Sequence, residues 1–222
     1  MPKTSVKRLL KGIVKFHERL LPKYAQRFRE LATTQAPDAL FIACSDSRIM
    51  PDMLASTRPG DLFMMRNVGN LVPPATAEGL SVGDLSEASA IEYAVLVLNV
   101  PNIVVCGHSE CGAMKAVLSK SERPETPNLN KWLRHAETAA IRLENKGGFD
   151  TSLKPHDQLS QLNVLMQLEN LTSYAIVRDR VLAGTLRLSA WWFDVPSGHM
   201  YAYDRTSQCF VPIDRETADR IV

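Results

Sequence analysis

The stretch Ala39-Leu40-Phe41-Ile42-Ala43-Cys44-Ser45-Asp46-Ser47-Arg48 begins with five apolar residues and ends with a cysteine, an acid and an arginine at alternate positions. A short apolar run of this length predicts a buried strand. Cys44, Asp46 and Arg48 would then lie at its carboxyl end. The cysteine could be a metal ligand, a nucleophile or a small core residue, and the last is the commonest role of a lone cysteine.

Short apolar runs recur along the chain, and the segments between them have helical spacing. The predicted strands are 39–43, 62–65, 103–106 and 185–192, with a closing hairpin or edge strand at 200–203 and 208–211. The predicted helices include the first thirty residues, with a second helix opening at Pro22, and the segments 86–98, 158–171 and 175–183. Strands that alternate with helices predict an α/β fold with a mainly parallel sheet of about four to five strands, flanked by helices.

Composition sets modest limits on the class of protein. The chain has 222 residues, of which 45% are apolar and 23% charged, and its net charge of +2 is too small to indicate a nucleic-acid partner. No apolar run approaches the roughly 18 residues of a membrane-spanning helix. The start Met1-Pro2-Lys3-Thr4 lacks the pattern of a signal peptide. We therefore expect one cytoplasmic domain over 1–222, without a membrane partner.

The N-terminal helix is basic and amphipathic, with apolar residues such as Leu9, Leu10 and Ile13 at helical spacing. Such a helix could lie on a membrane, but it lacks a tryptophan anchor. Packing on its own protein or on a second subunit is the favoured interpretation. We expect residues 1–34 to form a helical arm and residues 35–222 to form the α/β core.

Two groups of reactive residues come at predicted strand ends. In parallel sheets, sites collect at the carboxyl ends of the strands, so the segments Cys44–Arg48 and His108–Cys111 should share one crevice. His108 and Cys111 are separated by two residues, which lets both reach one ion. Together with Cys44 they make a set of two thiolates and an imidazole that suits zinc, and three protein ligands are typical of a catalytic zinc. Spacing alone does not exclude Cys106, although a core role suits its aliphatic neighbours better.

The paired motifs Cys44-x-Asp46-x-Arg48 and His108-x-x-Cys111-Gly112 resemble those of the beta-class carbonic anhydrases, and the similarity runs from about residue 6 to 211. The resemblance implies one zinc ion per chain, held by Cys44, His108 and Cys111, beside an ion-paired Asp46 and Arg48. It also implies a homodimer or a dimer of dimers, joined by the N-terminal helices. The residues that it places in a plant-type substrate pocket are Gln35, Phe63, Val68, Tyr93 and Gly112.

The activity that the resemblance implies is reversible hydration of carbon dioxide to bicarbonate and a proton, by attack of zinc-bound hydroxide. Asp46 suits the role of accepting the hydroxide's hydrogen, and Arg48 can hold that carboxylate off the metal bidentately. Gln35 could donate its amide to the forming bicarbonate.

Two other functions fit the same motifs. The site could hydrolyse carbon disulfide or carbonyl sulfide. Alternatively, the zinc could be structural, in a regulatory protein in which Asp46 is a permanent fourth ligand.

Overall fold

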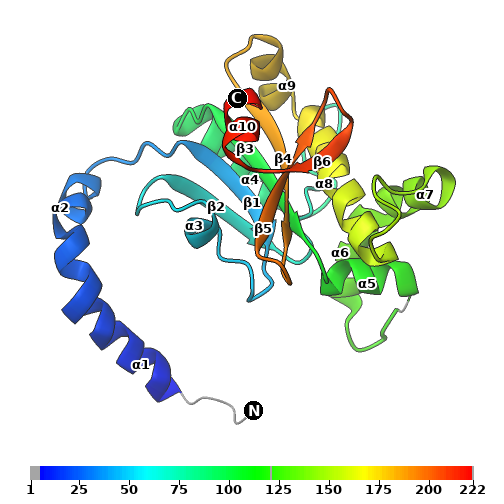
Figure 1. The fold of residues 1–222 in the computed structure, drawn as a ribbon. Coiled ribbons are helices and arrows are strands. Elements are labelled where there is room, and N and C mark those ends of the chain that lie inside the picture. The colour runs from blue at the N-terminus through cyan, green and yellow to red at the C-terminus, as the bar shows by residue number, and fades with distance from the viewer. Residues whose placement is uncertain (1–5, 121, 222) are drawn as a thin grey trace.

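The computed structural model describes residues 6–120 and 122–221, and at its centre is a six-stranded mixed sheet with the order β2-β1-β3-β4-β5-β6 (Figure 1). The strands are β1 Ala39–Cys44, β2 Leu62–Asn67, β3 Asn102–His108, β4 Arg187–Asp194, β5 His199–Asp204 and β6 Cys209–Pro212. The first four are parallel, and β5 and β6 return antiparallel. The predicted α/β class is confirmed. The strand count exceeds the expected four to five because both arms of the closing hairpin join the sheet.

Helices surround this sheet. In chain order they are α1 Val6–Lys15, η1 Phe16–Leu20, α2 Leu21–Leu31, α3 Pro51–Leu54, α4 Leu85–Glu92, η2 Tyr93–Val97, α5 Gly112–Ser119, α6 Pro127–Leu133, η3 Arg134–Ala136, α7 Glu137–Lys146, α8 Pro155–Ser173, α9 Ala175–Leu182 and α10 Arg215–Arg220. The sequence did not predict the short helices α3 and α10.

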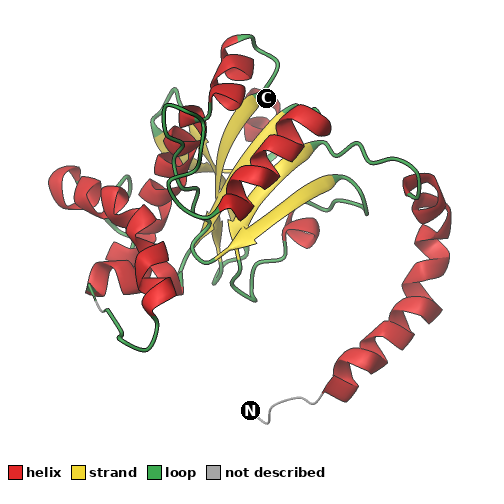
Figure 2. Ribbon diagram, turned by 180° about the vertical axis from the view of Figure 1, so that it is seen from behind, coloured by secondary structure: helices red, strands yellow, loops and turns green. Residues whose placement is uncertain are grey.

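One face of the sheet is covered by α4, α8 and α9, and the main apolar core lies beneath them (Figure 2). Alternate residues of β1, such as Leu40 and Ile42, point into this core, whereas Phe41 belongs to a second cluster on the opposite face. The close approach of α8 to β3 depends on Gly107, since a Cβ there would lie 2.6 Å from Val164 Cγ2. The sheet and α8 therefore hold the end of β3 firmly.

The N-terminal helices form an arm that extends away from the body (Figure 1). The chain is helical from α1 through η1 into α2, where η1 is a wider π-helical turn and Pro22 lies in the first turn of α2. Arg27 connects α2 to the body by donating to the Asp61 carboxylate and to the Pro59 carbonyl, both at 3.1 Å. The first five positions of the predicted arm lie outside the described residues. None of the described helices is both long enough and apolar enough to span a lipid bilayer.

Candidate metal centre

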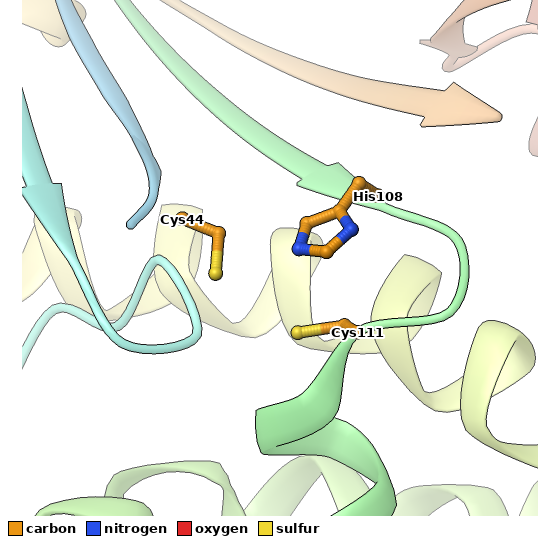
Figure 3. A group of neighbouring side chains, drawn as sticks. All are labelled: Cys44, His108 and Cys111. Carbon is orange, nitrogen blue, oxygen red and sulfur yellow. The ribbon is translucent and has the colours of Figure 1, made fainter. Parts of the chain in front are cut away.

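Cys44, His108 and Cys111 converge at the carboxyl ends of the central strands. Cys44 ends β1 and His108 ends β3, and these strands are parallel neighbours in the sheet. Cys111 immediately precedes α5. One ligand atom from each residue lies within 4.8 Å of the other two, and all three residues are buried. Figure 3 shows the two sulfur atoms and the imidazole ring around a common space, as the strand-end argument predicts.

The donor atoms have the chemistry that a zinc site needs. His108 Nδ1 lies 2.8 Å from the Ser109 carbonyl, which requires the ring proton on Nδ1 and leaves the lone pair on Nε2. Nε2 is buried and has no hydrogen-bond partner among the described residues. A hydrogen bond from the Cys111 thiol lowers the pKa of Cys44, and the same bond raises the pKa of Cys111. A thiolate, a thiol beside it and an orphaned imidazole nitrogen fit Zn²⁺.

Two further groups fix the position of Cys44. The Gly69 N–H donates to Cys44 Sγ at 3.4 Å, from a backbone whose φ of +86° favours glycine. Arg66 donates to the Cys44 carbonyl from Nε at 3.1 Å and from Nη2 at 2.9 Å, and its Nη2 also donates to the Asp46 carbonyl at 2.8 Å. The turn that leaves β1 is thus held from β2 and the loop that follows it.

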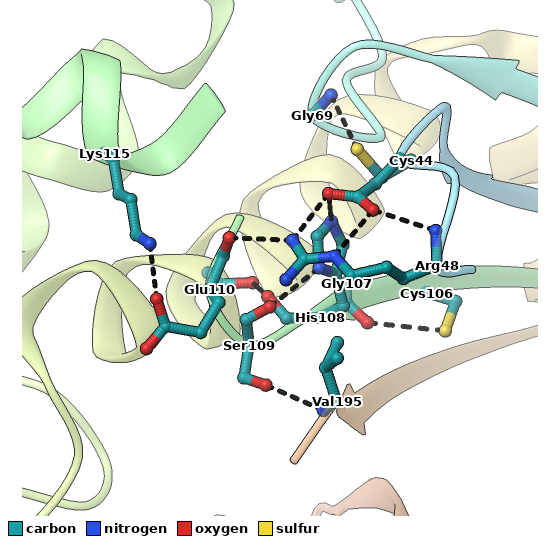
Figure 4. A network of polar contacts seen from close by, with 12 residues as sticks. Cys44, Arg48, Gly69, Cys106, Gly107, His108, Ser109, Glu110, Lys115 and Val195 are labelled. Atoms are coloured by element: carbon teal, nitrogen blue, oxygen red, sulfur yellow. Dashed lines mark hydrogen bonds and ion pairs between the residues drawn. The ribbon is translucent and has the colours of Figure 1, made fainter. Parts of the chain in front are cut away.

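Asp46 and Arg48 form a bidentate ion pair beside the three donors. Arg48 Nε donates to Asp46 Oδ1 at 2.9 Å and Nη2 donates to Oδ2 at 2.7 Å (Figure 4). This hydrogen bonding is the main reason why the pKa of Asp46 is well below its usual range. Asp46 Oδ2 is 4.0 Å from His108 Nε2, so the carboxylate borders the metal position while Arg48 holds it.

Of the pocket residues expected from the sequence, Val68 and Gly112 lie with the metal ligands. Val68 is 42% exposed, and its carbonyl accepts a hydrogen bond from Trp132 Nε1 at 2.7 Å. Gly112 follows Cys111 directly, and a Cβ at this position would have no heavy atom within 4 Å. The space next to Cys111 is therefore open to a small molecule.

The other three pocket residues, Gln35, Phe63 and Tyr93, are not brought to the ligands of the same chain. Gln35 is exposed in the loop before β1, and the length of β1, roughly 16 Å at about 3.3 Å per residue, separates the end of that loop from Cys44. Phe63 lies near the amino end of β2 and stacks on Tyr93, with ring centroids 5.7 Å apart. Phe63 and Tyr93 therefore lie together, apart from the metal ligands of the same chain.

The sequence analysis missed the polar residues of α8 that hold the site loops. Ser160 Oγ donates to the His108 carbonyl at 2.8 Å, and Asn163 Nδ2 donates to the Gly69 carbonyl at 3.1 Å. The Val72 N–H donates to Gln167 Oε1 at 2.8 Å. All three side chains are buried and lie three or four residues apart, which places them on one face of the helix. Polar residues at this spacing inside a predicted helix were the available signal.

The remaining cysteines stand apart from the metal centre. Cys106 is fully buried, and burial raises its pKa to about 12, so it is a protonated core residue, in line with the interpretation that its neighbours favoured. Cys209 is half-buried at the start of β6. Glu110, His156 and Asp157 form a second cluster of possible ligand atoms, but Lys115 and Lys154 occupy the Glu110 carboxylate.

The fold and the site together define an α/β protein with a mononuclear Cys₂His metal centre at the carboxyl edge of its sheet. Residues 39–200 match the family model described as carbonic anhydrase. The chain is 41% identical over 214 residues to a carbonic anhydrase of Pseudomonas aeruginosa, covering 96% of this chain and 94% of that one. It is 39% identical over 216 residues to a carbonic anhydrase of Synechococcus elongatus, covering 94% of this chain and 75% of the relative.

Solved structures agree with these sequence matches. The beta-carbonic anhydrase CcaA superposes with a TM-score of 0.85 at 35% identity, covering 94% of this chain and 92% of that one. A tetrameric beta-carbonic anhydrase of Sordaria macrospora gives a TM-score of 0.76 at 28% identity, covering 92% and 98%. The chain belongs to the beta class of the carbonic anhydrase family.

Proposed function

We propose that this chain catalyses the zinc-dependent, reversible hydration of carbon dioxide to bicarbonate and a proton. The observation that supports this most directly is the convergence of Cys44, His108 and Cys111 next to an Asp46 carboxylate that Arg48 holds bidentately. When bound by these three donors, zinc supplies the Lewis acidity that makes hydroxide available near neutral pH.

We assign the residues around this centre as follows. Asp46 accepts a hydrogen bond from the attacking oxygen and so orients it toward carbon dioxide. Arg48 keeps the Asp46 carboxylate from binding the metal itself. Val68 and the open space at Gly112 form the part of the substrate pocket that this chain provides.

The rest of the pocket comes, in this proposal, from a second copy of the chain. Gln35, Phe63 and Tyr93 lie too far from the metal ligands of their own chain to touch the same substrate. Tyr93 is 42% exposed beside Phe63, as expected for a surface that faces a partner. Gln35 of one copy then donates its amide to the bicarbonate forming at the other.

Two apolar surfaces support a homodimer or a dimer of dimers. The arm exposes Leu9, Leu10 and Ile13 on α1, each more than half accessible. On the sheet face opposite α8, Trp191 and its neighbours line a groove of about 810 Å³. Burying such surfaces against each other is the main driving force of stable homodimers.

We further propose that residues 1–222 form one functional unit, an arm at 1–34 on a core at 35–222, and that it works in the cytoplasm. The four cysteines are unpaired, and the two ligands must be reduced in order to bind zinc.

The deciding experiment is stopped-flow hydration of carbon dioxide between pH 6 and 9, with zinc content measured on the same sample. We expect about one zinc per chain and activity that rises toward alkaline pH, and Asp46→Asn should retain zinc but lose most turnover. Tightly bound zinc without hydration at any pH would instead favour a structural site. Assays with carbon disulfide and carbonyl sulfide distinguish carbon dioxide hydration from the alternative, hydrolysis of these two compounds at the same site.

Oligomerisation has its own test. The double variant Leu9→Asp, Ile13→Asp should be monomeric by light scattering and should retain zinc but lose hydration activity. A monomer with full activity would show that one chain makes a complete pocket.

A further inference from the structure

Glu110, between the ligands His108 and Cys111, has a strained backbone. Its φ is +58°, in the left-handed region that non-glycine residues rarely adopt. Such a conformation persists only where surrounding contacts fix it. The Glu110 carbonyl accepts a hydrogen bond from Arg48 Nη2 at 3.1 Å, the atom that also donates to Asp46 Oδ2 (Figure 4). The backbone at Glu110 thus sets one of the two acceptors that orient the Arg48 guanidinium.

The contact that fixes this backbone comes from α8. The Glu110 N–H donates to Asp157 Oδ1 at 2.5 Å, and Asp157 is only 5% exposed in the first turn of the helix. A charge-assisted bond to a buried carboxylate is among the stronger hydrogen bonds in proteins. Ser160, one turn further along α8, donates to the His108 carbonyl, so the segment that bears two zinc ligands is held at two points.

The Glu110 side chain is a weaker candidate for the same role. Its carboxylate pairs with Lys115 and Lys154, whose side chains are 45% and 66% exposed. Exposed ion pairs contribute little to holding a conformation because solvent screens them and long side chains lose entropy in forming them. The buried bond to Asp157 is therefore the one that restrains the peptide.

We propose that Asp157 is a positioning residue for the reaction: it holds Glu110 in its left-handed conformation so that the Glu110 carbonyl aligns Arg48, and Arg48 in turn aligns Asp46. The inference rests on the proposed function, in which the alignment of Asp46 controls turnover. Asp157 acts through the peptide and has no contact with substrate. Its effect should fall on kcat, with little change in KM or in zinc content.

The test compares two variants of nearly equal size. Asp157→Leu removes the acceptor, whereas Asp157→Asn keeps an amide oxygen that can accept the same N–H bond. Both substitutions remove the negative charge from the first turn of α8, so the loss of stability caused by removing that charge should be the same in the two variants. Asp157→Ala repeats the loss of the acceptor without bulk in case leucine prevents folding.

Two control variants are available in the same chain. Lys154→Gln removes an exposed ion pair with the Glu110 carboxylate and leaves residue 110 unchanged. Asp214→Leu removes another carboxylate that accepts a backbone N–H, from Thr217 at 2.8 Å, at α10 and away from the metal centre. Both controls should keep kcat within about threefold of wild type, because exposed pairs and a distant helix cap do not align Arg48.

Each protein is measured for stopped-flow kcat and KM, zinc content, and amide hydrogen exchange of the peptide containing Glu110 by mass spectrometry. We expect kcat of Asp157→Leu to fall by about 10- to 100-fold, as for other small misplacements of catalytic groups, with one zinc per chain. Exchange at Glu110 should accelerate at least tenfold, and Asp157→Asn should stay within about threefold of wild type in both readouts.

The proposal is overturned if Asp157→Leu, or Asp157→Ala in its place, is folded and zinc-loaded with wild-type kcat. It is equally overturned if Asp157→Asn loses as much activity as the leucine variant, or if exchange at Glu110 does not change. A wild-type protein that holds zinc without hydrating carbon dioxide refutes the proposed function instead, and the exchange rates then still decide whether Asp157 fixes the Glu110 peptide.

Discussion

Replacing Arg48 with alanine should leave zinc bound but release Asp46 from its bidentate pair. The substitution removes the two side-chain bonds to the carboxylate, at 2.9 and 2.7 Å, and the bond to the Glu110 carbonyl at 3.1 Å. It retains the Arg48 backbone N–H, which donates to Asp46 Oδ1 at 3.0 Å. Because Asp46 Oδ2 is 4.0 Å from His108 Nε2, a small rotation would bring the freed carboxylate to the metal position.

The size of the effect follows from the geometry of the pair. Hydrogen bonds to charged groups contribute about 1.5–3 kcal/mol each where solvent is excluded. The Arg48 side chain is 44% exposed, so screening reduces the two bonds together to about 2 kcal/mol. That energy corresponds to about a 30-fold change in the balance between the held and released carboxylate, and kcat/KM should fall by a similar factor. Arg48→Lys, which keeps the charge but loses the planar fork, should fall by about fivefold.

Stopped-flow hydration at pH 8, with zinc measured on the same samples, checks this prediction. The zinc-edge X-ray absorption spectrum of Arg48→Ala should show a carboxylate oxygen in place of the solvent oxygen, seen as added scattering from the carboxylate carbon. The matched control is Arg220→Ala, which breaks a remote ion pair with Asp204 and should keep wild-type turnover. Wild-type kcat/KM in fully zinc-loaded Arg48→Ala would refute the assignment of Arg48 as the group that restrains Asp46.

Three further predictions concern the frame around the site. Gly69→Ala should lower the melting temperature by several degrees and reduce activity, because alanine at a φ of +86° costs about 1–2 kcal/mol. In the zinc-loaded protein at pH 8, iodoacetamide should modify Cys209 but not Cys106, because burial raises the pKa of Cys106 to about 12. Removal of zinc by a chelator should make the two ligand cysteines reactive as well. Mass spectrometry of the labelled peptides checks both results. The hydrogen bond from Arg220 lowers the pKa of Asp204 to about 2, so its stabilising effect is complete above the unfolded pKa of about 3.9 and is lost as the pH falls toward 2. The difference in melting temperature between wild type and Asp204→Asn should therefore shrink across that range, and a constant difference would contradict it.

The convergence of Cys44, His108 and Cys111 was predictable because the order of the apolar runs and the geometry of a parallel sheet both lead to one site. Cys44 and His108 each end an apolar run, and parallel neighbours in a sheet must bring their carboxyl ends together. The spacing from His108 to Cys111 then supplied the third ligand without any long-range information. The α/β class followed equally directly from runs whose apolar residues are buried on both faces of the sheet.

The restraints on those ligands were not predictable in the same way. In the sequence, Asn163 and Gln167 are ordinary polar residues of a predicted helix, and nothing indicates which groups their side chains bind. Their partners are backbone atoms of Gly69 and Val72, about a hundred residues away. Because nearly every residue has the same backbone N–H and C=O groups, the sequence does not identify such a partner. The left-handed turn at Glu110 is hidden for a similar reason, since glutamate carries no signal for positive φ.

The positions of the expected pocket residues are not explained by a single chain. The family resemblance names Gln35, Phe63 and Tyr93 beside Val68, yet strand direction places the first three toward the amino ends of β1 and β2. The carboxyl end of a strand cannot fold back onto its own amino end, because about 3.3 Å of extended backbone separates each residue from the next. In the proposed assignment, one chain therefore provides the metal centre and a second copy provides the rest of the pocket. If both sets of residues touch one substrate, the second set belongs to another copy, and dimerisation becomes a condition of catalysis as well as a source of stability.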